Sequence, residues 1–129
     1  MTYIATLIPE DERITVLFPD LPGCGTVGDT LDEALIMAAE ALGGHIEALR
    51  EIGGAIPVPR SLSSIRAEID DIDTTLVAVP LIEDRGTAKR VNISMDPGLL
   101  DAIDGAAKSR GMTRSAFLSS AARRELLGI

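Results

Sequence analysis

Three hydrogen-bonding side chains alternate along one short segment in the C-terminal part of the chain. From Lys89 to Met95, polar and apolar residues alternate, and Arg90, Asn92 and Ser94 fall on the same side. This period of two is typical of a half-buried strand. Arginine can bind a guanine edge through two hydrogen bonds, asparagine can bind adenine in the same way, and serine can bond to either. The segment therefore predicts a strand whose polar face contacts DNA bases.

Two predicted helices must position this strand. Asp96 and Pro97 form a helix cap and a first-turn proline, and the helical pattern that follows runs to Gly111, where a left-handed glycine is expected to end it. A second helical pattern starts at Thr113. One strand and two helices in about 40 residues cannot close a core without a staple or a partner. The chain has a single cysteine, so we expect the partner to be a second copy of the same chain.

Two copies of the strand, side by side, would form an antiparallel ribbon that fits the DNA major groove. Its inner face would be apolar, built from Val91, Ile93 and Met95. This arrangement resembles the ribbon-helix-helix DNA-binding module. The free N–H groups at the start of the second helix suit a DNA phosphate. The expected phosphate contacts are Lys89, Thr113, Arg114 and Ser115. The alternative is a plain dimerisation strand with its polar face in solvent.

Charge divides the chain into two parts. Residues 1–84 hold 16 Asp/Glu and 4 Lys/Arg, a balance of −12, whereas residues 85–129 hold 4 Asp/Glu and 8 Lys/Arg, a balance of +4. The basic part suits phosphates, and the acidic part would repel nucleic acid and attract a basic protein. The acidic residues could also serve only as a solvated surface.

The N-terminal part mixes strand and helix patterns. Thr30 and Glu33 form a capping box, and the helix that they open carries an apolar stripe and ends at Gly53-Gly54. The expected elements are strands over 3–8 and 13–18, this helix, an edge strand over 55–59, a short helix over 61–70 and a strand over 74–80. The stripe comprises Leu31, Leu35, Ala38, Leu42, Ile46 and Leu49.

This part resembles the HicB antitoxin family, and the resemblance extends over nearly the whole chain. The matching residues are Phe18-Pro19-Asp20-Leu21-Pro22-Gly23-Cys24, Thr26, Gly28-Asp29-Thr30, Glu33-Ala34, and Ile56-Pro57 with Pro59. The resemblance implies an α+β chain. Its N-terminal part would be a degraded ribonuclease-H-like β-β-α-β-β domain over 1–82, followed by a linker over 83–88. A ribbon-helix-helix (β-α-α) domain over 89–129 would dimerise.

The family also implies a function. Such an antitoxin binds and inhibits a small basic HicA-type toxin that cleaves mRNA, and it represses its own operon by binding operator DNA. The expected partners are therefore the toxin, operator DNA and a second copy of the chain, as a homodimer or a higher homo-oligomer. No cofactor, metal or catalytic residue is expected, so the chain is predicted not to be an enzyme.

Two other functions remain open. One is a stand-alone dimeric transcriptional regulator whose N-terminal domain senses a ligand or mediates assembly. The other is a metal-dependent nuclease, because paired carboxylates can hold Mg²⁺ for phosphodiester hydrolysis. The candidate carboxylates are Asp20, Asp29, Asp32 and Glu33 in one cluster, and Glu68, Asp70, Asp71 and Asp73 in another. The acids of the first cluster also suit a helix start, and the second cluster suits a solvated turn.

The remaining signals favour ordinary structural roles. The segment Gly23–Gly28 matches a dinucleotide-binding pattern, but the nearby prolines and the following helix favour a glycine-rich turn. His45 lies beside the apolar stripe of the long helix and is expected to be partly buried or at the edge of that stripe, and Cys24 is expected in a turn or core. No apolar stretch suits a membrane span and no signal peptide is recognisable, and a single cysteine agrees with a cytoplasmic protein.

Overall fold

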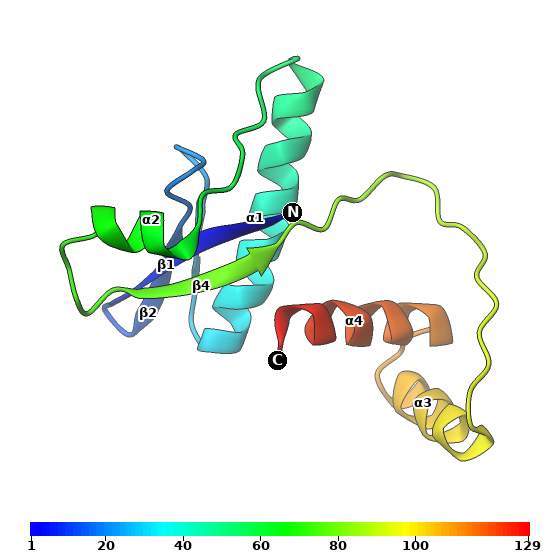
Figure 1. Ribbon diagram of the computed structural model, residues 1–129. Helices are drawn as coiled ribbons and strands as arrows, with labels where there is room; N and C mark the ends of the chain where they lie inside the picture. Colours follow the sequence, from blue (N-terminus) through cyan, green and yellow to red (C-terminus); the bar gives the residue numbers. More distant parts are fainter. The chain divides into compact units, whose positions relative to one another are not determined.

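The computed structural model describes residues 1–129 as two compact units, Met1–Asp84 and Arg85–Ile129. The first unit contains a four-stranded sheet and two helices, and the second contains two further helices (Figure 1). The boundary between the units falls where the charge balance changes from −12 to +4. None of the helices combines the length and the apolar character needed to cross a membrane.

The sheet is antiparallel throughout, with the strand order β3-β2-β1-β4. Its strands are β1 (Thr2–Glu10), β2 (Arg13–Leu17), β3 (Gly25–Gly28) and β4 (Thr75–Pro80). Leu7 lies opposite Val16, and Tyr3 lies opposite Val79, so these four side chains share one face. All four are buried, whereas Leu17 on the other face is 46% exposed. The face that carries Tyr3 and Val16 is therefore buried, and Ile4 and Thr6 on the opposite face of β1 are buried as well.

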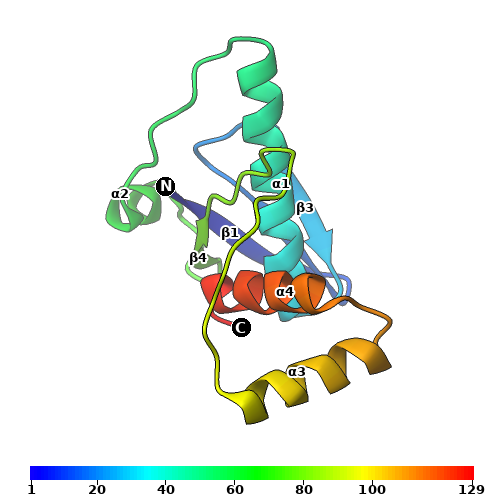
Figure 2. The same cartoon turned by 90° about the vertical axis from the view of Figure 1, so that its right-hand side faces the viewer.

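The long helix α1 (Leu31–Glu51) lies against the sheet, as Figure 2 shows. Thr30 Oγ accepts a hydrogen bond from Glu33 N at 3.2 Å, and the Glu33 carboxylate accepts one from Asp29 N at 3.2 Å. The predicted capping box is thus confirmed. A Cβ at Gly28 would lie 2.5 Å from Ala34 N, so glycine lets β3 and α1 approach closely.

The predicted apolar stripe of α1 is largely confirmed. Four of its six residues are buried, namely Leu35, Ala38, Leu42 and Ile46. Leu49 is half-buried, whereas Leu31, the first residue of the helix, is 53% exposed. The short helix α2 (Leu62–Glu68) is also confirmed, capped by Ser61 and fully burying Ile65.

The predicted β-β-α-β-β order is wrong in two places, since the unit reads β-β-β-α-α-β. Residues 25–28 form β3 and pair with β2, where a glycine-rich turn was expected. Residues 55–59 form no strand. Pro57 has no N–H to donate to a strand partner, and its carbonyl accepts a hydrogen bond from the Tyr3 hydroxyl at 2.6 Å instead.

The second unit consists of α3 (Pro97–Ser109) and α4 (Arg114–Leu127). The Asp96 carboxylate accepts a hydrogen bond from Leu99 N at 3.1 Å, which confirms the predicted cap. Gly111 follows α3 with φ +65°, which confirms the left-handed conformation predicted there.

Candidate functional site

The C-terminal unit has almost no hydrophobic core of its own. Ile103 and Ala107 are its only buried hydrophobic residues, whereas the N-terminal unit buries 16. Helix α4 buries none of its residues. A unit of this size with so little burial is not expected to be stable by itself.

Apolar side chains of this unit lie instead at its surface. Val91 is 74% exposed, Ile93 62%, Leu99 53% and Leu126 61%. The helical spacing of Leu99 and Ala121 predicts that both pack inward, but both are exposed in the single chain. Leu100, Phe117 and Leu118 are half-buried. The unit thus exposes the kind of surface that proteins normally cover with a partner.

The segment before α3 has no regular secondary structure, so the strand predicted over residues 89–95 is absent from the single chain. A strand needs a neighbour for its backbone N–H and C=O groups, and this segment has none. Lys89 to Ser94 are exposed, and Met95 is half-buried. The predicted base-contacting residues Arg90, Asn92 and Ser94 are accordingly accessible, as are Val91 and Ile93.

The start of α4 brings together three of the four predicted phosphate contacts, whereas Lys89 lies on the segment before α3. Thr113 caps the helix, and its Oγ accepts a hydrogen bond from Ala116 N at 3.1 Å. Arg114 and Ser115 follow in the first turn, and both are exposed. The first turn contains no acidic residue, so the positive end of the helix dipole is not offset within α4.

Arg114 has a partner that the sequence did not suggest. Its Nε and Nη2 donate to Oδ1 and Oδ2 of Asp104 in α3, both at 2.8 Å. These hydrogen bonds lower the pKa of the Asp104 carboxyl below its usual value. The residues are 10 positions apart, with the turn at Gly111 between them, so neither helical nor strand spacing could have identified the pair.

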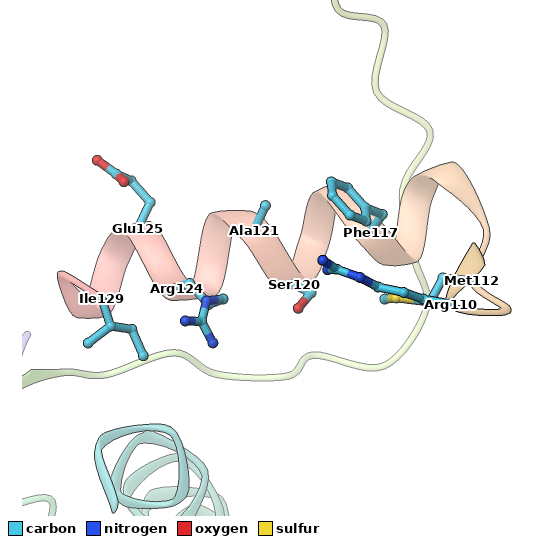
Figure 3. Close-up of a pocket in the computed structure, with 8 residues that line it drawn as sticks. All are labelled: Arg110, Met112, Phe117, Ser120, Ala121, Arg124, Glu125 and Ile129. Carbon is cyan, nitrogen blue, oxygen red and sulfur yellow. The ribbon is translucent and has the colours of Figure 1, made fainter. Parts of the chain in front are cut away.

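A pocket of about 290 Å³ opens along α4 (Figure 3). The guanidinium of Arg110 lies 5.5 Å from the centre of the Phe117 ring, within the range of a cation–π contact. The lining residues are Arg110, Met112, Phe117, Ser120, Ala121, Arg124, Glu125 and Ile129. Half of the lining residues are apolar, and these add to the apolar surface that this unit already exposes.

Three carboxylates of the two candidate clusters accept hydrogen bonds from arginine side chains or a backbone N–H rather than facing one another. Asp29 accepts a hydrogen bond from Arg13 Nε at 2.7 Å, and Asp20 accepts one from Arg60 Nε at 2.5 Å. Asp71 accepts one from Asp73 N at 2.9 Å. No three His, Cys, Asp or Glu residues are grouped so that they could hold a metal ion. Neither carboxylate cluster is therefore assembled as a metal site in this structure.

Cys24 and His45 have the surroundings expected of structural residues. The Cys24 thiol is buried and donates to the carbonyl of Ala41 at 3.7 Å. Burial raises its pKa to about 11, so the reactive thiolate is scarce at neutral pH. His45 is half-buried on α1, as predicted. The glycines after Cys24 belong to β3, so the dinucleotide-binding interpretation has no loop to support it.

Comparison with known proteins gives a consistent result. A family model described as HicB-like antitoxin of bacterial toxin–antitoxin system matches residues 3–122. An uncharacterised 14.9 kDa protein of Haemophilus phage HP1 is 34% identical over 131 residues, which cover 98% of each chain.

Two solved structures are also similar. The antitoxin HicB of Burkholderia pseudomallei is 29% identical, with 98% of each chain covered and a TM-score of 0.59. A complex of HicA3 and HicB3 contains a chain that is 30% identical, with a TM-score of 0.53 over 64% of this chain and 99% of that one. Since the family model matches most of the sequence, the chain belongs to the HicB-like antitoxin family of bacterial toxin–antitoxin systems.

Proposed function

We propose that this antitoxin has two activities, one in each unit. The N-terminal unit, a degraded ribonuclease-H-like domain, binds and inhibits a small basic HicA-type toxin that cleaves mRNA. The C-terminal unit forms a ribbon-helix-helix homodimer that binds operator DNA and represses the antitoxin's own operon. The protein itself has no catalytic role.

The observation that carries this proposal is the coincidence of the structural and electrostatic boundaries. The units separate between Asp84 and Arg85, and the charge balance changes from −12 to +4 at the same position. Complementary charge accelerates association and disfavours partners of the same sign. An acidic unit suits a basic protein, whereas a basic unit suits DNA phosphates.

The toxin partner is further supported by the solved HicA3–HicB3 complex, because its matching chain corresponds to 64% of this protein. The N-terminal unit holds 16 of the 18 buried hydrophobic residues, so it has the core needed to fold and bind alone. Asp20 and Asp29, two of the carboxylates considered for catalysis, are paired with Arg60 and Arg13, which fits inhibition of the toxin by binding.

DNA binding is supported by the exposed segment from Lys89 to Met95. Pairing with the same segment of a second copy would satisfy its backbone groups and cover Val91 and Ile93, which are 74% and 62% exposed. The same pairing would place Arg90 and Asn92 together on one polar face, twice in each dimer.

The test compares the full chain with a fragment of residues 1–84 and one of residues 85–129. Each is titrated with a small basic HicA-type toxin, in calorimetry at low and high salt. We expect the full chain and the 1–84 fragment to bind this protein, more weakly at high salt because the charges are screened. The 85–129 fragment should not bind it.

A 1–84 fragment that folds but fails to bind would contradict the assignment of toxin binding to this unit. Failure of the full chain as well would favour a stand-alone regulator. Circular dichroism of each fragment separates loss of binding from loss of folding.

A further inference from the structure

Arg114, which the proposed function assigns to a DNA phosphate, already forms an ion pair with Asp104 in the free protein. Both carboxylate oxygens are engaged at 2.8 Å by two N–H groups of one guanidinium. This two-point geometry is also the one in which arginine binds phosphate oxygens. In the free protein, Asp104 therefore stands where a phosphate oxygen pair would bind.

We propose that Asp104 is an internal competitor of DNA phosphate, which limits how strongly Arg114 holds the DNA backbone. The inference rests on the proposed DNA-binding function and adds a specificity-determining residue to it. A phosphate reaches the same edge of the guanidinium only by displacing the carboxylate of α3.

The exposure of the pair favours competition over a purely structural role. The side chains of Arg114 and Asp104 are 54% and 42% exposed. Ion pairs this exposed contribute little to folding stability, because water and salt screen them. They can also be opened at low cost, so a phosphate can replace the carboxylate.

Because Arg114 begins α4, competition from Asp104 weakens phosphate binding at the start of this helix. Arg114 is the first residue of α4, where exposed backbone N–H groups and the helix dipole already favour an anion. Phosphate contacts carry no sequence information. Weakening them at both copies of α4 lowers binding to every DNA, so that discrimination depends more on the base contacts.

The experiment uses the full-length protein with Asp104→Asn, which keeps the shape of the side chain but removes its charge. Binding is measured to a duplex from upstream of the antitoxin's own coding sequence and to a scrambled duplex, across a salt series. We expect both affinities to rise. Two released arginines per dimer should steepen the dependence of log affinity on log salt by up to about 2.

Two further variants distinguish the effect of breaking the Asp104–Arg114 pair from the effect of removing one negative charge. Asp101→Asn makes the same change of charge on the same helix, at an exposed position, and should shift binding less. Asp104→Asn combined with Arg114→Gln should differ from Arg114→Gln alone by no more than Asp101→Asn differs from the wild type, because the arginine through which Asp104 acts is gone. Circular dichroism and light scattering check that each variant stays folded and keeps its oligomeric state.

The outcomes are distinguishable. Wild-type protein that binds neither duplex would overturn both the inference and the DNA-binding function. Wild-type binding with an Asp104→Asn variant that is unchanged, weaker, or no different from Asp101→Asn would overturn the role of Asp104 alone.

Discussion

Asp20 and Arg60, 40 residues apart, are joined by two hydrogen bonds. The Asp20 carboxylate accepts one from the backbone N–H of Arg60 at 2.9 Å and one from its Nε at 2.5 Å. The Asp20 side chain is 5% exposed, and Arg60 also pairs with Glu68 of α2. The acid therefore fastens the loop after β2 to the segment that follows α1.

We expect Asp20→Asn to lower the free energy of unfolding by about 1–3 kcal/mol, since a buried acceptor loses its charge and part of its hydrogen bonding. The matched control is Asp29→Asn, which removes an exposed pair with Arg13 and should cost less than about 1 kcal/mol. Urea denaturation measures both. Equal losses for the two variants would mean that Asp20 is not a structural acid.

The sequence predicted the elements that carry strong local signals. The capping box at Thr30, the cap at Asp96 and the left-handed Gly111 were all identified because each is determined by a few neighbouring residues. β3 was missed because it has only four residues, two of them glycine, and exists through its pairing with β2. The long-range contact of Asp20 with Arg60 carries no local signal.

In the candidate site too, the sequence predicted what depends on neighbouring residues and missed what depends on packing. Alternation over residues 89–95 indicated which side chains share a face, but a strand there requires a second chain, and the single chain has none. Arg114 was identified from its place at a helix start. Its partner Asp104 depends on how α3 and α4 pack, which no spacing rule determines.

Gly43 and Gly44 offer a matched test of how the end of the N-terminal unit is held. A Cβ at Gly43 would lie 2.7 Å from the carbonyl oxygen of Ile82, whereas a Cβ at Gly44 would meet nothing within 4 Å. Leu81 N donates to Met1 O at 2.8 Å in the same stretch. We expect Gly43→Ala to loosen this stretch, with faster hydrogen exchange at the Leu81 amide.

Gly44→Ala should instead stabilise the protein by about 0.5–1 kcal/mol, since alanine is favoured over glycine inside a helix. Thermal unfolding and hydrogen exchange on both variants give the comparison. Equal stabilisation by the two alanines, without faster exchange at Leu81, would show that the approach of Ile82 to α1 is unimportant.

The Cys24 thiol should make the folded protein less stable at high pH. Burial raises its pKa from 9.0 to about 11, so the unfolded chain loses this proton first. Stability from this group is constant below pH 9 and falls as the pH rises from 9 to 11, by no more than about 3 kcal/mol. Urea denaturation between pH 8 and 11 measures it, with Cys24→Ala as the variant that should lack this component. A wild-type protein and variant with parallel pH profiles would refute it.

Ile93 should connect dimerisation with DNA binding. It is 62% exposed in the single chain, and the proposed ribbon would bury it against the second copy. We expect Ile93→Asp to dissociate the dimer and abolish operator binding, because two buried carboxylates would face each other. Light scattering and a DNA-binding assay measure both. Binding of the toxin to the same variant should persist, and a variant that stays dimeric through this unit would argue against the ribbon.

Arg90 and Asn92 should read bases, whereas Arg114 should hold the backbone. We expect Arg90→Ala and Asn92→Ala each to cost ~1–3 kcal/mol on the operator and to relax sequence preference there, because each removes a base contact. Arg114→Ala should weaken operator and scrambled duplex alike and flatten the salt dependence by at most about 2, since a dimer presents two copies. Fluorescence anisotropy on both duplexes across a salt series decides between these behaviours. If Arg90→Ala weakens both duplexes equally, Arg90 contacts the DNA backbone and does not read sequence. If it changes neither affinity, the residues from 89 to 95 serve dimerisation alone.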